Sequence, residues 1–116
     1  MLPRRYRLRK KSDFARVLKN GQSRNSRFLA IKFVNNGNSF SRLGLLASKK
    51  VFKKASQRNY VKRKLREAAR LNLSRINPGQ DIIFIARAGL EKKTLKETEA
   101  VILFLLKEAG LVKNNE

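Results

Sequence analysis

The residues of this chain that could do chemistry are almost all cationic. Ten Lys and Arg fall between residues 49 and 70, against a single acid, Glu67. Such a density of like charge is best tolerated where a polyanion neutralises it, and Arg, Lys and Asn hydrogen-bond to phosphates, sugars and base edges. This segment therefore predicts a nucleic-acid-binding surface.

The chain offers little for catalysis by its own side chains. Without His or Cys, the usual general base and the usual thiol nucleophile are both missing, and no glycine-rich phosphate loop is present. Its eight carboxylates are scattered, with no spacing that suggests a metal site or an acid–base pair. We therefore expect no catalytic residue and no metal or other cofactor bound by this protein, so another component would perform any associated reaction.

The overall composition supports a folded, basic protein. Lys and Arg number 29 against 8 Asp and Glu, which gives a formal net charge of +21 on 116 residues, yet 41% of the residues are hydrophobic. A field of that size attracts polyanions, while the apolar content excludes a disordered basic tail. We expect one domain, 1–116, with a basic arm at 1–11 and a frayed tail at 112–116.

The same composition bears on where the protein works. The longest apolar run, 100–106, is too short to cross a bilayer, and no apolar core region follows the basic N-terminus as it would in a signal peptide. The absence of Cys fits a reducing compartment. We expect a cytoplasmic protein without a membrane partner.

The element that must position the cations is a helix predicted over 56–73, with Ser56 as its N-cap. At about 100° per residue its side chains divide into two neighbouring sectors. The packing sector holds Val61, Leu65, Ala68, Ala69 and Asn72. The other sector, here called the basic ridge, holds Asn59, Lys62, Arg63, Arg66 and Arg70, with Arg58 on its boundary.

The basic ridge suits an RNA or DNA strand better than solvent. Arg58, Lys62 and Arg66 stand one turn apart along roughly 12 Å of helix, which matches successive phosphates. The alternative is a solvated helix face, but such faces usually interleave acids at i,i+4, and this one has only Glu67.

Other elements must surround this helix. A short helix is predicted from a cap at Ser12 to Gly21, and 22–27 could form an edge strand. Residues 28–34 and 40–48 read as a hairpin joined by an Asn/Gly turn, whereas 81–86 is typical of a strand covered on both faces. Residues 94–109 predict a closing helix. The chain is thus expected to be α+β, with one mixed sheet.

Phe14 allows two interpretations. With Val17 and Leu18 it forms an apolar helix face, which favours a core position. The alternative is a platform on which an unpaired base stacks, as aromatic residues do in single-strand binding sites.

At these places the chain resembles the protein subunit of bacterial ribonuclease P. The resemblance is carried by LRKKSDFARV at 8–17, RLGLLASKK at 42–50 and, most specifically, RNYVKRKLRE at 58–67. Three positions depart from the family pattern: Tyr60 stands where Arg is usual, Phe52 near a usual Gly, and Leu18 where Phe is frequent. Tyr60 lies outside the basic ridge, so the ridge does not depend on an Arg at this position.

The resemblance implies a two-layer α/β sandwich of order α-β-β-β-α-β-α, with a mixed four-stranded sheet and a left-handed crossover, similar to a ribosomal-protein domain. It implies a catalytic RNA subunit that uses Mg²⁺ to remove the 5′ leader of precursor tRNA. The protein would be a monomer in a 1:1 complex with ribonuclease P RNA.

The resemblance also assigns roles to residues. The leader would lie in a cleft lined by Phe14, Leu18 and Ile31, with Arg58, Asn59, Lys62 and Arg66 along its wall. The RNA subunit would face Lys49, Lys50, Lys53, Lys54 and Arg63, and Arg70 would extend the RNA-binding surface.

Two other functions share the charge and the size. A ribosomal protein or general RNA chaperone would not change tRNA 5′-end processing. A DNA-binding protein would place the 56–73 helix in a major groove, but no helix-turn-helix partner or dimerisation element is predicted.

Overall fold

A mixed four-stranded sheet lies at the centre of the molecule, in the order β1-β2-β4-β3. In this computed structural model, which describes residues 3–113, β2 pairs antiparallel with β1 and β4, and β3 pairs parallel with β4. The strands are β1 (Gln22–Asn25), β2 (Leu29–Asn35), β3 (Arg42–Leu46) and β4 (Gln80–Ala86). The helices are α1 (Lys11–Asn20), α2 (Ala55–Leu71) and α3 (Leu95–Glu108), with short 3₁₀ turns η1 (Arg4–Tyr6), η2 (Leu73–Arg75) and η3 (Leu90–Lys92). The expected α+β order and the mixed sheet are confirmed.

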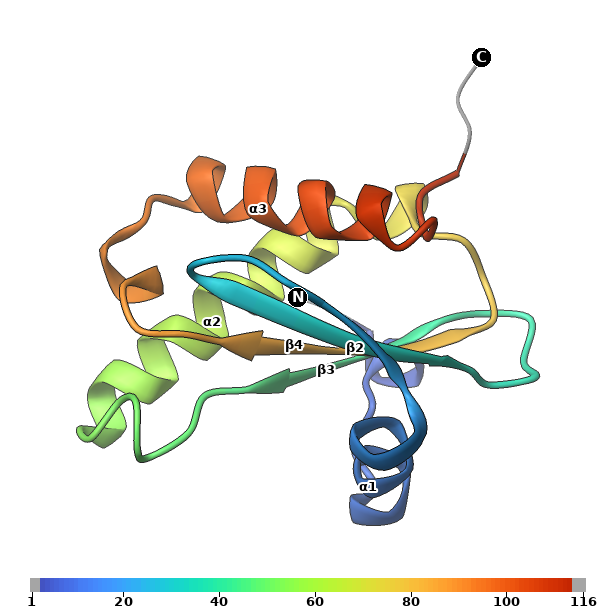
Figure 1. Cartoon of the computed structure of the whole chain (residues 1–116), viewed down its shortest axis with the longest axis horizontal. Helices are drawn as coiled ribbons and strands as arrows, with labels where there is room; N and C mark the ends of the chain where they lie inside the picture. The colour runs from blue at the N-terminus through green and yellow to red at the C-terminus, as the bar shows by residue number, and fades with distance from the viewer. Residues whose placement is uncertain (1–2, 114–116) are drawn as a thin grey trace.

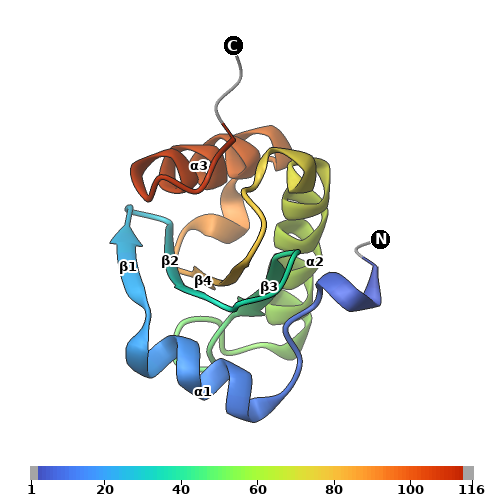
Figure 2. The same cartoon turned by 90° about the vertical axis from the view of Figure 1, so that its right-hand side faces the viewer.

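The helices lie on both faces of the sheet (Figures 1 and 2). Helices α2 and α3 cover a large core that includes Leu29, Ile31 and Phe84, all fully buried. Helix α1 covers part of the opposite face through a smaller cluster around Val17 and Ile83. Helix α1 therefore adds a third, partial layer to the expected two-layer sandwich.

The predicted hairpin between 28–34 and 40–48 is wrong. Both strands pair with β4, which lies between them: Phe33 is opposite Ile82, and Leu43 lies beside Ile82 on the other side. The turn itself forms, with Gly37 at φ 73°. The apolar strand β4 takes the central position because only there are both of its faces buried, and the chain after the turn passes around it to the far edge.

The predicted caps at Ser12 and Ser56 are also wrong. The cap positions of α1 and α2 lie two residues earlier, at Lys10 and Lys54, and no side-chain hydrogen bond caps either helix. Before α1, the N–H of Leu8 donates to the Leu43 carbonyl of β3 at 2.8 Å, which fixes the chain just ahead of the helix. By contrast, α3 has Thr94 as its cap, in a capping box with Glu97.

The N-terminal segment is not an independent extended arm. Residues 4–6 form η1, and Leu8 is only 4% exposed in the cluster beneath the sheet. The segment lies beside β3 at the sheet edge (Figure 2). Of the predicted frayed tail, Val112 bridges to Ile76, while 114–116 lie outside the described residues. No helix in the described range is long and apolar enough to span a membrane.

Candidate nucleic-acid interface

A cavity of about 240 Å³ opens at the edge of β3, between the N-terminal segment, α1 and α2. We call it the Phe14 cavity. It contains one aromatic ring, four cations and no carboxylate: its lining residues are Arg7, Leu8, Arg9, Phe14, Leu43, Leu45, Lys62 and Arg66. An aromatic face beside several cations is the combination that holds an unpaired base and its phosphates.

The position of Phe14 combines features of both interpretations, the core residue and the stacking platform. The residue is half-buried, and its ring rests against β3, where a Cβ added to Gly44 would lie 2.6 Å from Cζ of Phe14. Glycine at 44 is therefore what lets the ring approach the strand. Val17, one turn further along α1, is fully buried and anchors the helix, so Phe14 can line the cavity without carrying the core.

Helix α2 supplies the opposite wall. Val61 and Leu65 are fully buried against the sheet, which turns the half-buried Lys62 and Arg66 toward the cavity. The predicted sectors of this helix are thus confirmed, including Asn72, which is 3% exposed.

Four residues predicted for the leader cleft or its wall do not line the cavity: Leu18, Ile31, Arg58 and Asn59. Ile31 is fully buried among the core residues under α2 and α3, on the sheet face opposite α1, because alternate residues of β2 point to opposite faces. Leu18 packs into the Val17 cluster instead. Arg58 donates from Nη1 to the carbonyls of Phe52 at 2.9 Å and Lys53 at 3.1 Å, so part of its hydrogen-bonding capacity holds the loop before α2.

The loop between β3 and α2 presents four lysines to solvent. Lys49, Lys50, Lys53 and Lys54 are all exposed. Phe52, in the middle of them, is 1% exposed and anchors the loop in the core. Phe52, which stands near a position where the family usually has Gly, therefore has a packing role.

The remaining ridge residues divide. Asn59 and Arg63 are exposed and do not line the Phe14 cavity, and Arg63 instead lines a shallow pocket with Tyr60, Glu67 and Leu95. Arg70 is paired with Glu67 through Nε at 3.0 Å and Nη2 at 2.6 Å. The hydrogen bonds from Arg70 hold the pKa of Glu67 below its ordinary value, so the acid of the segment is committed to the last ridge cation.

Sequence reasoning missed a buried ion network centred on Asp81, which is fully buried at the start of β4. Its Oδ1 accepts from Asn36 Nδ2 and Arg42 Nε, each at 2.9 Å, and its Oδ2 accepts from Arg42 Nη2 at 2.7 Å and from Arg16 of α1. These partners are far apart in the chain, so no spacing could reveal them.

The ion network lowers the pKa of Asp81 and also ties α1 to the site. Burial would raise the pKa of Asp81, but the hydrogen bonds from Arg42 and Asn36 and the charges of Arg42 and Arg16 outweigh it, and the pKa lies below its ordinary value. Because Arg16 belongs to α1, the network ties α1 to the sheet and thereby helps position Phe14.

Lys64 was also missed, as a structural cation within the basic segment. It is 8% exposed, and its Nζ donates to the carbonyls of Leu90 at 2.7 Å and Lys93 at 2.6 Å. These bonds join α2 to the segment around η3. Lys64 is therefore not available to a nucleic acid.

The donor set of the described residues does not fit a metal site. No group of three or more His, Cys, Asp or Glu side chains within 3–113 comes together to hold an ion. The cavity walls carry cations, which repel a metal ion. The arrangement can bind and orient an anion.

These features define a class: a small basic α+β protein whose interface combines an aromatic ring, a cationic cavity and a lysine-rich loop. A sequence model of the family Ribonuclease P matches residues 2–110. The chain belongs to this family, and it is thus a subunit of ribonuclease P, the endoribonuclease that processes tRNA.

Individual relatives agree with the family model. The ribonuclease P protein component of Alkaliphilus oremlandii is 43% identical over 108 residues, covering 93% of this chain and 94% of the relative. That of Clostridioides difficile is 42% identical over 105 residues, covering 90% of this chain and 91% of the relative.

Solved structures show the same fold. The RNase P protein of Staphylococcus aureus superposes with a TM-score of 0.81 at 34% identity, covering 93% of this chain and 98% of that one. The RNase P protein of Thermotoga maritima gives a TM-score of 0.79 at 36% identity, covering 88% and 96%.

Proposed function

We propose that this chain holds the 5′ leader of precursor tRNA in the Phe14 cavity while its lysine-rich loop and Arg63 contact ribonuclease P RNA. The observation that carries the proposal is the cavity itself, in which a half-buried aromatic ring lies among Arg9, Lys62 and Arg66 without an opposing carboxylate. A single strand can stack a base on the ring and place its phosphates at the cations.

The chemistry would belong to the RNA. In this proposal Mg²⁺ is bound by the RNA subunit and supplies the activated water, while the cations of this chain orient the substrate and screen phosphate repulsion. The protein would act in the bacterial cytoplasm as a monomer in a 1:1 complex with its RNA.

The direct test is to mix the chain with a ribonuclease P RNA and precursor tRNA at low Mg²⁺, where the RNA alone cleaves slowly. We expect the chain to accelerate leader removal. A ribosomal protein or general RNA chaperone would bind the RNAs without changing the 5′-end processing rate, and that outcome would refute the proposal.

Binding to ribonuclease P RNA should weaken steeply with salt. Seven cations lie exposed or half-buried on the loop and the ridge without an ion pair in the described structure: Lys49, Lys50, Lys53, Lys54, Lys62, Arg63 and Arg66. If about six to eight phosphates are neutralised, log K should fall against log salt with a slope of about −5 to −7.

Filter binding between low and high salt measures this slope. Lys53→Gln should reduce it by about 1, whereas Lys107→Gln, an exposed lysine on α3, should leave it unchanged. An affinity independent of salt would contradict the electrostatic basis of the interface.

Arg63→Ala and Lys62→Ala should have different effects although the two residues are neighbours. Arg63 is exposed and does not line the Phe14 cavity, so its loss should weaken assembly with ribonuclease P RNA and raise the Mg²⁺ concentration needed for activity, because Mg²⁺ can replace lost cationic screening. Lys62 lines the cavity, so its loss should mainly weaken precursor tRNA binding. Mg²⁺ titrations and substrate-binding assays distinguish the two; identical profiles for both variants would show that the two sides of α2 do not divide the work.

A further inference from the structure

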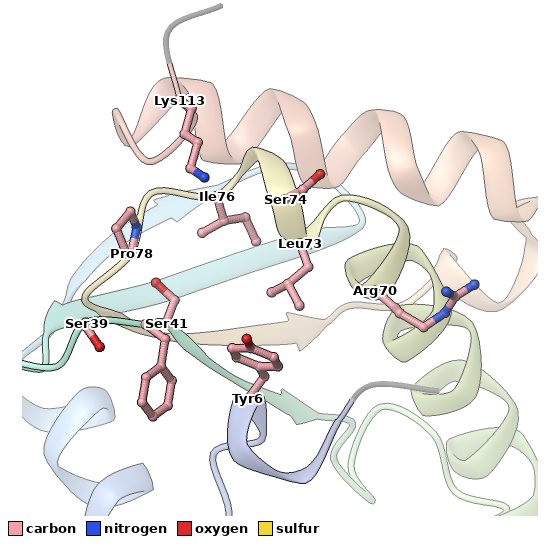
Figure 3. Close-up of a pocket in the computed structure, with 10 residues that line it drawn as sticks. Tyr6, Ser39, Ser41, Arg70, Leu73, Ser74, Ile76, Pro78 and Lys113 are labelled. Atoms are coloured by element: carbon pink, nitrogen blue, oxygen red, sulfur yellow. The ribbon is translucent and has the colours of Figure 1, made fainter.

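A second pocket, of about 440 Å³, lies at the C-terminal end of α2 (Figure 3). We call it the Tyr6 pocket. It is built by the η1 turn, the loop before β3, the η2 turn and the segment after α3, and its lining residues are Tyr6, Ser39, Phe40, Ser41, Arg70, Leu73, Ser74, Ile76, Pro78 and Lys113. It shares no lining residue with the Phe14 cavity.

The lining suits an amphipathic anion. Half of the residues are aromatic or aliphatic, two are cations, and none is acidic. The volume falls within the range of about 300–1,000 Å³ that is typical of small-molecule sites. A nucleotide has these properties, since it joins a flat apolar ring system to a phosphate.

The aromatic wall is held in place before any ligand arrives. The rings of Tyr6 and Phe40 meet edge to face, with centroids 5.7 Å apart, and the Arg5 guanidinium lies 4.9 Å from the centroid of Tyr6. In Figure 3, the Tyr6 side chain points into the pocket toward Leu73. A preorganised aromatic side chain binds a base with little ordering cost.

The polar floor is equally fixed. The Ser41 hydroxyl donates to the carbonyl of Asn77 at 2.7 Å and accepts from the N–H of Gln80 at 3.0 Å. The floor therefore cannot collapse into the space above it without breaking both bonds.

Lys113 is the cation available to a phosphate. Its backbone N–H donates to the Arg75 carbonyl at 2.7 Å, and its amino group points into the pocket toward Ile76 (Figure 3). Within the described residues this amino group has no hydrogen-bond or ion-pair partner. Arg70, in contrast, is engaged by Glu67.

We propose that the Tyr6 pocket binds an unpaired nucleotide of an RNA partner, with the base against Tyr6 and Leu73 and the phosphate at Lys113. The proposal rests on the proposed RNA binding, since an RNA supplies the nucleotide. The Tyr6 pocket would give the protein a further RNA contact at the C-terminal end of α2, whereas the lysine-rich loop lies at its N-terminal end.

The first test uses adenosine 5′-monophosphate as the probe and the full ¹⁵N-labelled chain. Amide signals of Tyr6, Leu73, Ser74 and Lys113 should shift on titration. Lys113→Glu should weaken the apparent affinity about tenfold, and Lys107→Glu, which makes the same charge change on exposed α3, should alter it less than about twofold. Equal effects of the two variants, or shifts confined to the Phe14 cavity, would overturn the proposal.

The aromatic wall has its own pair of variants. Tyr6→Phe keeps the ring and should retain binding of the probe, whereas Tyr6→Ala should weaken it about tenfold or more. Tyr6→Ala also removes packing against the core. If that variant does not fold, the comparison of Lys113→Glu with Lys107→Glu decides whether the pocket binds the probe. Unchanged binding by a folded Tyr6→Ala protein counts against the site.

Competition identifies the source of the nucleotide. Ribonuclease P RNA and precursor tRNA are added separately to the complex with adenosine 5′-monophosphate, and displacement by either supports the proposal and names the RNA. If both RNAs bind the chain and neither displaces the probe, the assignment to RNA is overturned. Leader binding at the Phe14 cavity is measured by other variants, so the two proposals fail independently.

Discussion

Asp81→Asn is expected to lower the free energy of unfolding by about 3 kcal/mol, because it removes the charge on which two arginines converge. Asp81 is fully buried, whereas Arg42 is 23% and Arg16 36% exposed in their side chains. The arginines can therefore regain some hydration, which places the loss at the low end of the range for breaking a buried pair. Urea denaturation at neutral pH measures the change.

A matched control is Asp13→Asn. Asp13 also faces Arg42, at 3.3 Å, but it is partly exposed, so the loss should be at most about 1 kcal/mol. Equal losses for the two variants would show that burial of Asp81 is not what makes its ion network strong.

The same network makes stability depend on pH. The folded-state pKa of Asp81 lies below its ordinary value of 3.8, so its ionised form is favoured by folding. The contribution is fully present above the unfolded-state pKa and is lost as the pH falls through the folded-state pKa. Wild-type stability should therefore drop at acid pH, and the difference from Asp81→Asn should shrink there; a difference that stays constant down to the lowest pH would contradict this account.

Asp81→Asn should leave the limiting cleavage rate of the assembled holoenzyme nearly intact at a temperature where the variant is folded. The carboxylate is buried and cannot contact RNA. A large loss of single-turnover rate in the folded variant would mean that the protein contributes to catalysis through this group.

Phe14→Ala is expected to weaken binding of precursor tRNA by about 1–3 kcal/mol, the size of one base-stacking interaction. Mature tRNA, which has no leader, should bind nearly as well as before. The ring is half-buried, so the stability loss should stay below the roughly 3–5 kcal/mol of a fully buried Phe. Equilibrium binding of the holoenzyme to both tRNAs, with thermal denaturation of the protein, provides the measurement.

Leu18→Ala is the matched control for Phe14→Ala. Leu18 is half-buried on the same helix but does not line the cavity, so its loss should cost stability without discriminating between precursor and mature tRNA. Gly44→Ala supplies a second approach, because the added methyl must displace the Phe14 ring and should reproduce part of the selective defect. If Phe14→Ala weakens both tRNAs equally, the ring belongs to the core and the leader lies elsewhere.

Much of the fold was predictable because it depends on local periodicity. The two sectors of α2, the exposed lysines before it and the capping box of α3 follow from residues within a few turns of one another. The same locality explains why Lys62 and Arg66 line the Phe14 cavity, because their direction follows from the burial of Val61 and Leu65.

Pairing across the sheet was not predictable in this way. The turn after β2 carries every local signal of a hairpin, yet β4, more than 40 residues later, takes the place beside β2. The register with β4 decides that Ile31 faces the core under α2 while its neighbour Lys32 faces α1, where its Nζ donates to the Leu18 carbonyl at 2.9 Å. Alternation in a strand sets two faces apart but does not say which face meets which helix.

The sequence by itself predicted a surface for a polyanion and offered no His or Cys for catalysis, since charge, missing residue types and the pattern of α2 are properties of composition and short-range order. Only the tertiary structure decided which cations serve that purpose. Lys64 is used to bind two carbonyls, Arg58 holds a loop, Arg70 pairs with Glu67 and Arg42 neutralises Asp81. The reason is physical: a cation is available to RNA only if no nearby acceptor already holds it, and for Lys64 and Arg42 those acceptors lie on chain segments that meet only on folding.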